Sequence, residues 1–192
     1  PFPAGVRDAL AAFRWAVTHA PELGAAPDRV AVGGDSAGGN VSAVTAQLPR
    51  ATGPVASLQL LIYPAIDLTQ TRTASGRLFA EGFYLTENDR QWSTRYYLSG
   101  TVRDATDPRA SPALAQDLSG LASAIVITAG FDPLRDEGEV YAEALRIAGT
   151  RVVLDRAQEL IHGFINMTTV PAARDAVLRL AGMVRASLAL AT

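Results

Sequence analysis

One serine in the sequence is flanked by small residues in a pattern that suits nucleophilic chemistry. Ser36 lies in Gly34-Asp35-Ser36-Ala37-Gly38, which fits the pattern G-x-S-x-G. At a sharp turn from a strand into a helix, small neighbours let the backbone bend and leave the serine hydroxyl exposed. The alternative interpretation is a tight turn with a helix-capping serine. A phosphate loop does not fit, because Asp35 replaces the second glycine of G-x-G-x-x-G and no lysine follows.

A serine hydroxyl is a weak nucleophile and needs a base, and the sequence offers two histidines for that role. His162 lies in the stretch LIHGFIN, between an apolar stretch and the last predicted helix. His19 lies near the end of the first predicted helix, where a cation meets the negative helix terminus. We therefore predict that His162 is the base and that His19 has a structural role.

The acid that orients the base is a choice among several carboxylates. Asp132 and Asp67 each follow an apolar stretch, whereas Asp136 and Glu137 lie where a helix begins and mainly serve the helix dipole. The 30 residues from Asp132 to His162 hold one helix and one strand, which puts the pair on adjacent loops, whereas Asp67 has to reach past an intervening strand. This spacing favours Asp132.

The elements that must position these side chains alternate between strands and helices. Nearly continuous apolar stretches, typical of parallel strands covered on both faces, predict strands at 29–34, 58–64, 124–130 and 151–155. Helical propensity and apolar residues three and four apart predict helices at 6–20, 40–48, 138–149 and 173–188. Pro49 is expected to stop the second helix.

This alternation predicts an α/β fold with an open, mostly parallel sheet flanked by helices, in which ligands lie beyond the carboxyl ends of the strands. We expect one domain over residues 1–192, with an irregular excursion at about 67–120 that contains a helix near 87–98. The excursion carries aromatic residues that could line a pocket, although core packing is their commoner use. They are Phe83, Tyr84, Trp92, Tyr96 and Tyr97.

Composition excludes several other kinds of chemistry. The 192 residues contain no cysteine, and all 17 basic residues are arginine, so thiol nucleophiles, Schiff bases and disulfides are excluded. With two histidines and no H-E-x-x-H motif, we expect no metal site and no cofactor. A net charge of -2 argues against a nucleic-acid partner. We also expect no membrane span and no signal peptide at the start of this sequence.

Four stretches together resemble the bacterial hormone-sensitive-lipase-like esterases, the GDSAG-type branch of the α/β-hydrolases. They are GGDSAGGN, LLIYPAIDLT, ITAGFDPLRDEGEVYAEAL and IHGF, in this order. The resemblance implies an α/β-hydrolase fold with Ser36 as nucleophile, Asp132 as acid and His162 as base. It also implies hydrolysis of short- to medium-chain carboxylic esters, a small-molecule substrate.

The sequence departs from this family at one point. Family members carry an H-G-G-G loop that supplies most of the oxyanion hole, whereas this sequence contains none, which leaves the backbone N–H of Ala37 as the remaining donor. We therefore expect the sequence to be a C-terminal portion of the hydrolase. In such a portion the 29–34 strand lies at a sheet edge, and we expect this unpaired edge to cause self-association into a homo-oligomer. We also expect a cytoplasmic location. The alternative function is a non-catalytic α/β-hydrolase homologue that binds a small molecule or a partner.

Overall fold

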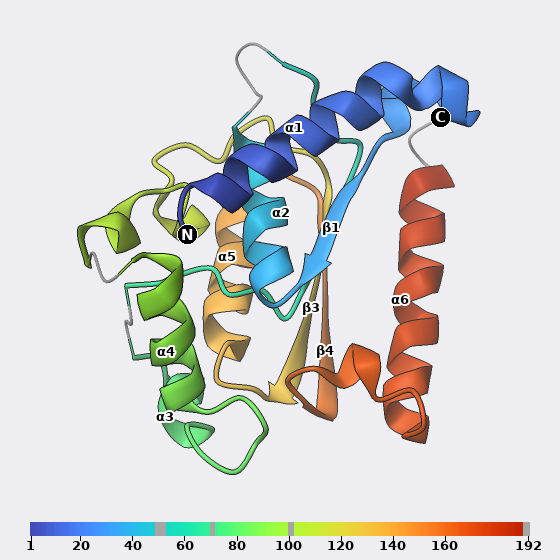
Figure 1. Cartoon of the computed structure of the whole chain (residues 1–192). Helices are drawn as coiled ribbons and strands as arrows, with labels where there is room; N and C mark the ends of the chain where they lie inside the picture. The colour runs from blue at the N-terminus through green and yellow to red at the C-terminus, as the bar shows by residue number, and fades with distance from the viewer. Residues whose placement is uncertain (49–52, 70–71, 100–101, 190–192) are drawn as a thin grey trace.

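The computed structural model describes residues 1–48, 53–69, 72–99 and 102–189 (Figure 1). Pro49, the expected end of the second helix, lies outside the described residues. Strands and α-helices alternate along most of the chain. In chain order they are α1 (Ala4–His19), β1 (Val32–Asp35), α2 (Ala37–Gln47), β2 (Gln59–Ile62), α3 (Ala74–Leu78), α4 (Glu87–Tyr97), β3 (Ala124–Phe131), α5 (Arg135–Ile147), β4 (Val152–Ile161) and α6 (Pro171–Ala189).

The four strands form one parallel sheet in the order β1-β2-β3-β4, so each strand lies beside its neighbour in the sequence. Because the strands are parallel, their carboxyl ends meet at one edge, and the residues that follow Asp35, Ile62, Phe131 and Ile161 gather there. Within the described ranges β1 pairs only with β2, which places it at the edge of the sheet as predicted.

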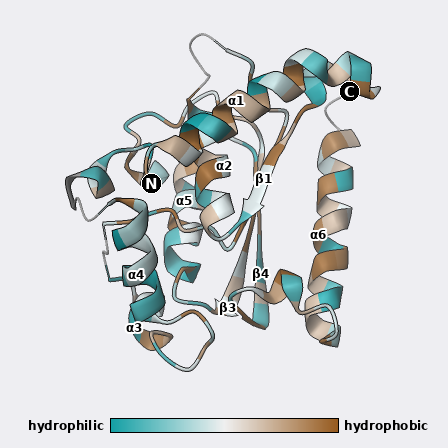
Figure 2. Cartoon of the chain, in the orientation of Figure 1, coloured by the Kyte–Doolittle hydropathy of each residue, from teal (hydrophilic) through white to brown (hydrophobic). Residues whose placement is uncertain are grey.

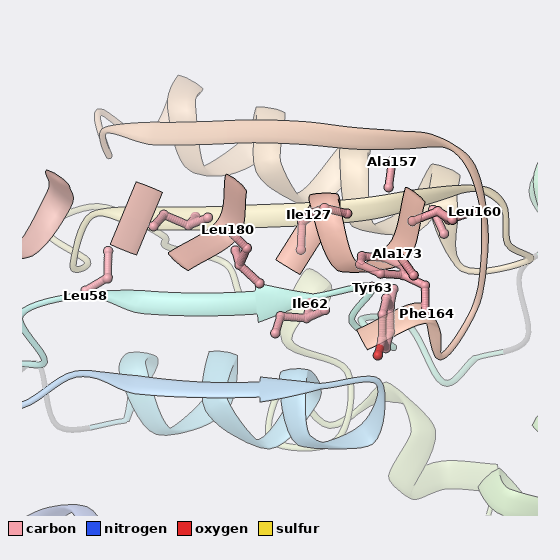
Figure 3. Close-up of a cluster of buried hydrophobic side chains, with 12 residues drawn as sticks. Leu58, Ile62, Tyr63, Ile127, Ala157, Leu160, Phe164, Ala173 and Leu180 are labelled. Carbon is pink, nitrogen blue, oxygen red and sulfur yellow. The ribbon is translucent and has the colours of Figure 1, made fainter. Parts of the chain in front are cut away.

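Helices cover both faces of the sheet (Figure 1). Side chains alternate across a strand, so Ile125 and Ile127 pack with Leu180 of α6 on one face. Val126, on the other face, packs with Tyr141 and other residues of α5. Figure 3 shows the cluster under α6, and Figure 2 shows apolar and polar residues alternating along that helix.

Most predicted elements are confirmed, with shifts of a few residues at their ends. The main correction concerns β4, which was predicted at 151–155 and extends to Ile161. Its second half, Arg156-Ala157-Gln158-Glu159, is mostly polar and therefore gave no apolar signal; pairing with β3 holds it in the sheet. His162 follows the last strand residue directly.

The excursion after β2 carries most of the non-sheet structure. It contains α3, the predicted helix α4, and two 3-10 helices at Val102–Thr106 and Pro112–Leu114. The Thr86 hydroxyl oxygen caps α4 by accepting from the Asp89 backbone N–H, and the Asp89 carboxylate accepts from the Thr86 backbone N–H in turn. This reciprocal pair explains why the helix begins there. Among the helices of the described ranges, none combines the length and hydropathy needed to cross a bilayer.

Candidate active site

The turn between β1 and α2 presents Ser36 at the carboxyl edge of the sheet. Ser36 has φ 53° and ψ -117°, a backbone conformation that a non-glycine residue adopts only under strain. Its N–H donates to the Ile62 carbonyl, 2.9 Å away, which ties the turn to the end of β2. This is the geometry expected of a nucleophile elbow.

The two glycines around Ser36 differ in their roles. A Cβ on Gly34 would lie 2.5 Å from the carbonyl carbon and oxygen of Gly38, so the turn closes only with glycine at position 34. A Cβ on Gly38 would meet no atom within 4 Å. The requirement for a small residue therefore concerns Gly34, while position 38 contributes its backbone to the close approach.

The structure brings Ser36, His162 and Asp132 together, although they are far apart in the sequence. His162 Nε2 lies 2.9 Å from Ser36 Oγ, and His162 Nδ1 lies 2.8 Å from Asp132 Oδ2. Asp132 is fully buried, and its other oxygen, Oδ1, accepts the Leu134 N–H at 2.8 Å. The carboxylate is thus fixed on both sides, and the imidazole connects it to the serine hydroxyl.

The other carboxylates weighed from the sequence do not contact His162 in the structure. Asp67 accepts two hydrogen bonds from Thr69, through the backbone N–H and the side-chain hydroxyl. Asp136 accepts the backbone N–H of Ser75 and pairs with Arg135. Each of these two groups stabilises a local turn or a contact between α3 and α5.

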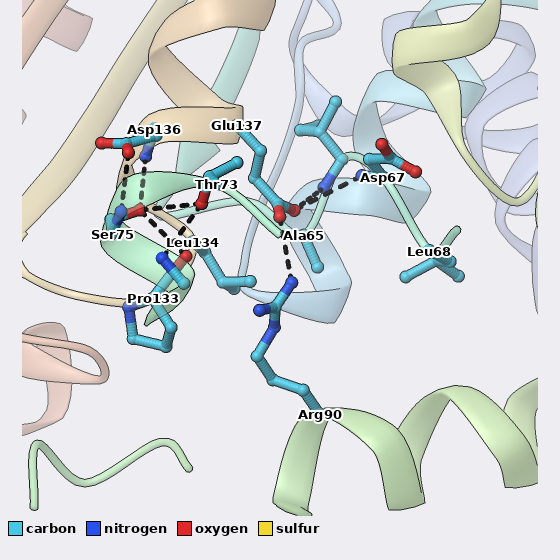
Figure 4. A network of polar contacts seen from close by, with 12 residues as sticks. Ala65, Asp67, Leu68, Thr73, Ser75, Arg90, Pro133, Leu134, Asp136 and Glu137 are labelled. Atoms are coloured by element: carbon cyan, nitrogen blue, oxygen red, sulfur yellow. Dashed lines mark hydrogen bonds and ion pairs between the residues drawn. The ribbon is translucent and has the colours of Figure 1, made fainter. Parts of the chain in front are cut away.

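Glu137 lies in the first turn of α5, as predicted, but it is also buried and contacts another helix, which the sequence did not indicate (Figure 4). Its Oε2 lies 3.1 Å from a guanidinium nitrogen of Arg90 on α4, and its Oε1 accepts the Ile66 N–H at 2.9 Å. Burial raises the pKa of Glu137 to about 7, against the opposing effect of the Arg90 charge. The pair joins the excursion helix α4 to α5. No sequence signal pointed to it, because its members lie 47 residues apart on different helices.

A cavity of about 170 Å³ opens beside Ser36. Its walls come from α2, the segment after β2, α4 and the beginning of α5. Apolar groups include Ala37, Val41, Ala65, Leu68 and Leu134. The ion pair between the half-buried Arg90 and the buried Glu137 forms part of the same wall, so the cavity is apolar with a few polar groups, as small-molecule sites usually are.

Core packing is the wrong prediction for three of the excursion aromatics. Tyr84, Trp92 and Tyr96 are between 61% and 68% exposed. Tyr97 lines the cavity, and Phe83 stacks on Phe131 with ring centroids 5.7 Å apart. α4 carries no fully buried residue, and of its aromatic side chains Tyr97 packs against a buried cluster, that of Leu98, Ala105 and Ala110.

His19 lies away from Ser36, as the last residue of α1. Its Nδ1 lies 2.9 Å from the Trp15 carbonyl oxygen, and its ring stacks on the Trp15 ring with a centroid separation of 4.4 Å. The prediction that His19 interacts with the end of its own helix is confirmed.

Comparisons with known proteins find carboxylic ester hydrolases as relatives of this chain. The chain is 56% identical over 173 residues to the carboxylic ester hydrolase LipN of Mycobacterium tuberculosis, covering 87% of this chain and 46% of LipN. It is 42% identical over 193 residues to the carboxylesterase NlhH of the same species, covering 97% of this chain and 60% of NlhH. The chain thus spans about half of each of these curated relatives.

Solved structures give the same result. The thermostable carboxylesterase EstE1, cloned from a metagenomic library, superposes with a TM-score of 0.92 at 44% identity, over 98% of this chain and 65% of that one. An esterase from the archaeon Pyrobaculum calidifontis gives a TM-score of 0.91 at 41% identity, over 100% of this chain and 61% of that one.

The family comparison covers most of the sequence. A family described as having the alpha/beta hydrolase fold matches residues 1–166, a range that includes Ser36, Asp132 and His162. The resemblance to hormone-sensitive-lipase-like esterases is confirmed by the carboxylesterase relatives. The chain therefore belongs to the alpha/beta hydrolase fold family.

Proposed function

We propose that this chain hydrolyses carboxylic esters of short to medium acyl length through an acyl-enzyme on Ser36. One observation carries the proposal: an unbroken series of contacts runs from Ser36 Oγ through His162 to the buried Asp132 carboxylate. A strained serine, an imidazole within hydrogen-bond distance and an orienting carboxylate are the groups that nucleophilic acyl transfer requires.

The chemistry assigns each group a role. His162 Nε2 takes the proton of Ser36 while Oγ bonds to the ester carbonyl carbon, and Asp132 stabilises the imidazolium that forms. The backbone N–H of Ala37, at the first position of α2, has no acceptor within its own helix and stabilises the oxyanion. The imidazolium returns its proton to the departing alcohol. Water, deprotonated by His162, then attacks the acyl carbon, and the imidazolium returns this proton to Ser36 Oγ as the acid departs.

The cavity supports a short acyl group. An engineered cavity of roughly 150 Å³ binds benzene. The cavity beside Ser36, about 170 Å³, therefore has room for an acyl chain of about six carbon atoms. We expect turnover to be highest for acetyl to hexanoyl esters and to fall for longer chains. The single-domain organisation, the cytoplasmic location and the homo-oligomer stay predictions.

The test is hydrolysis of p-nitrophenyl esters of increasing acyl length by the purified chain. We expect slow turnover, because this sequence lacks the H-G-G-G donors of the oxyanion hole, and a further loss of at least about 10³-fold in kcat/KM in Ser36→Ala. Ser119→Ala, at an exposed serine outside the cavity, is the matched control and should keep the wild-type rate. A rate in Ser36→Ala above about a tenth of wild type would contradict the mechanism. Absence of hydrolysis together with binding of an ester analogue would favour the non-catalytic alternative.

A further inference from the structure

Tyr63 lies against His162, and the mechanism above gives it no role. It follows the last residue of β2, and its ring is 1% exposed. The Tyr63 ring centroid lies 4.6 Å from that of His162. It lies 5.2 Å from that of Phe164, which follows His162 by two residues, and Figure 3 shows Tyr63 beside Phe164. Tyr63 therefore packs directly against the base.

The hydroxyl of Tyr63 faces the strand that carries the nucleophile. It donates to Asp35 Oδ2 at 3.3 Å, and Asp35 immediately precedes Ser36. Burial, and next the charge of Asp35, raises the pKa of Tyr63, so the hydroxyl keeps its proton and remains a donor. The carboxylates that act on Tyr63 are Asp35 and Asp132. One side chain thus contacts the base with its ring and the nucleophile's neighbour with its hydroxyl.

The backbone at Tyr63 is held in a strained conformation. Its φ of 32° is unfavourable for a residue with a bulky side chain. Such strain persists only where the surroundings over-determine it, and it is concentrated at functional sites. Here the Tyr63 N–H donates to the Ile127 carbonyl at 2.6 Å. Two residues later, the Ala65 N–H donates to the Ser36 carbonyl. The segment that follows β2 is thereby fixed to the turn that presents Ser36.

We propose that Tyr63 is a positioning residue for the base, a role that rests on the proposed function. The His162 side chain can rotate about its Cα–Cβ and Cβ–Cγ bonds, and such a rotation breaks the hydrogen bonds at Nδ1 and Nε2. The ring of Tyr63 stops that motion from one face, and the bond to Asp35 fixes the Tyr63 ring relative to the nucleophile strand.

The kinetic test compares two substitutions at Tyr63 with the same two at Tyr141. Tyr141 is equally buried and packs on the opposite face of the sheet, and its hydroxyl is also hydrogen-bonded, in this case accepting from Gln47 Nε2. We expect Tyr63→Leu to lower kcat by about 10²-fold with little change in KM, the scale of a misplaced catalytic group. Tyr63→Phe keeps the ring and should retain most of the activity. Tyr141→Leu and Tyr141→Phe should leave kcat close to wild type.

A second measurement reports on His162 without requiring turnover. The imidazole proton between Nδ1 and Asp132 is buried and should give a resolved downfield proton NMR line. The other histidine, His19, bonds at the surface, where its proton exchanges rapidly with water. We expect the line in wild type, in Tyr63→Phe and in both Tyr141 variants. It should be lost or broadened in Tyr63→Leu. Tyr63→Met, whose unbranched and flexible side chain adapts more readily to the space left by the ring, replaces the Leu variant if that chain does not fold.

The outcomes separate this proposal from the proposed function. An inactive wild-type chain, or one whose activity survives Ser36→Ala, would refute the proposed hydrolysis, while the NMR comparison would still decide the role of Tyr63. An unchanged imidazole line in folded Tyr63→Leu would overturn the positioning role. A kcat loss in Tyr141→Leu equal to that in Tyr63→Leu would also overturn it, because the effect would then come from loss of core packing alone.

Discussion

Replacing Glu137 with glutamine isolates one buried charge and its effect on stability. Burial raises the pKa of Glu137 from 4.5 to about 7. Because the folded chain binds this proton more tightly than the unfolded chain, the group stabilises the fold fully below pH 4.5 and loses that contribution as the pH rises through 7. At about 1.4 kcal/mol per unit of pKa, the loss amounts to roughly 3 kcal/mol.

Urea unfolding followed by circular dichroism, at pH values between about 4.5 and 8, measures this effect. Relative to Glu137→Gln, the wild-type free energy of unfolding should fall by about 3 kcal/mol across the range, because glutamine does not titrate. Glu143→Gln removes an exposed carboxylate from the same helix and should keep the wild-type pH dependence. Parallel curves for wild type and Glu137→Gln would refute the reasoning, since they would mean that Glu137 has the same pKa in both states.

Further predictions concern the elbow, the acid and the sheet edge. Gly34→Ala should lower the free energy of unfolding in urea by about 2 kcal/mol or more, because its Cβ would collide with the Gly38 backbone. A Cβ at position 38 would meet no atom within 4 Å, so Gly38→Ala should cause no such collision. Asp132→Asn should lower kcat by roughly 10³- to 10⁴-fold, far more than Asp67→Asn, and the reverse order would contradict the choice of acid. Light scattering should show self-association, because within the described residues β1 is paired on one side only; a monodisperse monomer would contradict this expectation.

The parts of this fold that the sequence predicted carry strong local signals. Continuous apolar stretches marked the inner strands β2 and β3, and the polar residues directly after strand ends marked Ser36 and Asp132. Because the carboxyl ends of parallel strands share one edge, residues separated by 126 positions, Ser36 and His162, were expected to meet, and they do.

The features that the sequence did not predict depend on tertiary contacts. The second half of β4 is polar and is a strand only because β3 pairs with it. The contact between Arg90 and Glu137 depends on how α4 lies against α5, which no local pattern encodes. Tyr63 lies in an apolar stretch that reads simply as strand. Its backbone strain and its contacts with Asp35 and His162 exist only in the folded chain.

The central claim is that Ser36 is a nucleophile activated by His162, and covalent labelling tests it most directly. A p-nitrophenyl phosphonate ester should phosphonylate Ser36 Oγ as phosphorus loses p-nitrophenolate, with the serine proton passing to His162. Peptide mass spectrometry of the labelled wild-type chain should place one adduct at Ser36, and folded His162→Ala should label at least about 10²-fold more slowly. Labelling at another residue, or an undiminished rate in His162→Ala, would contradict the account.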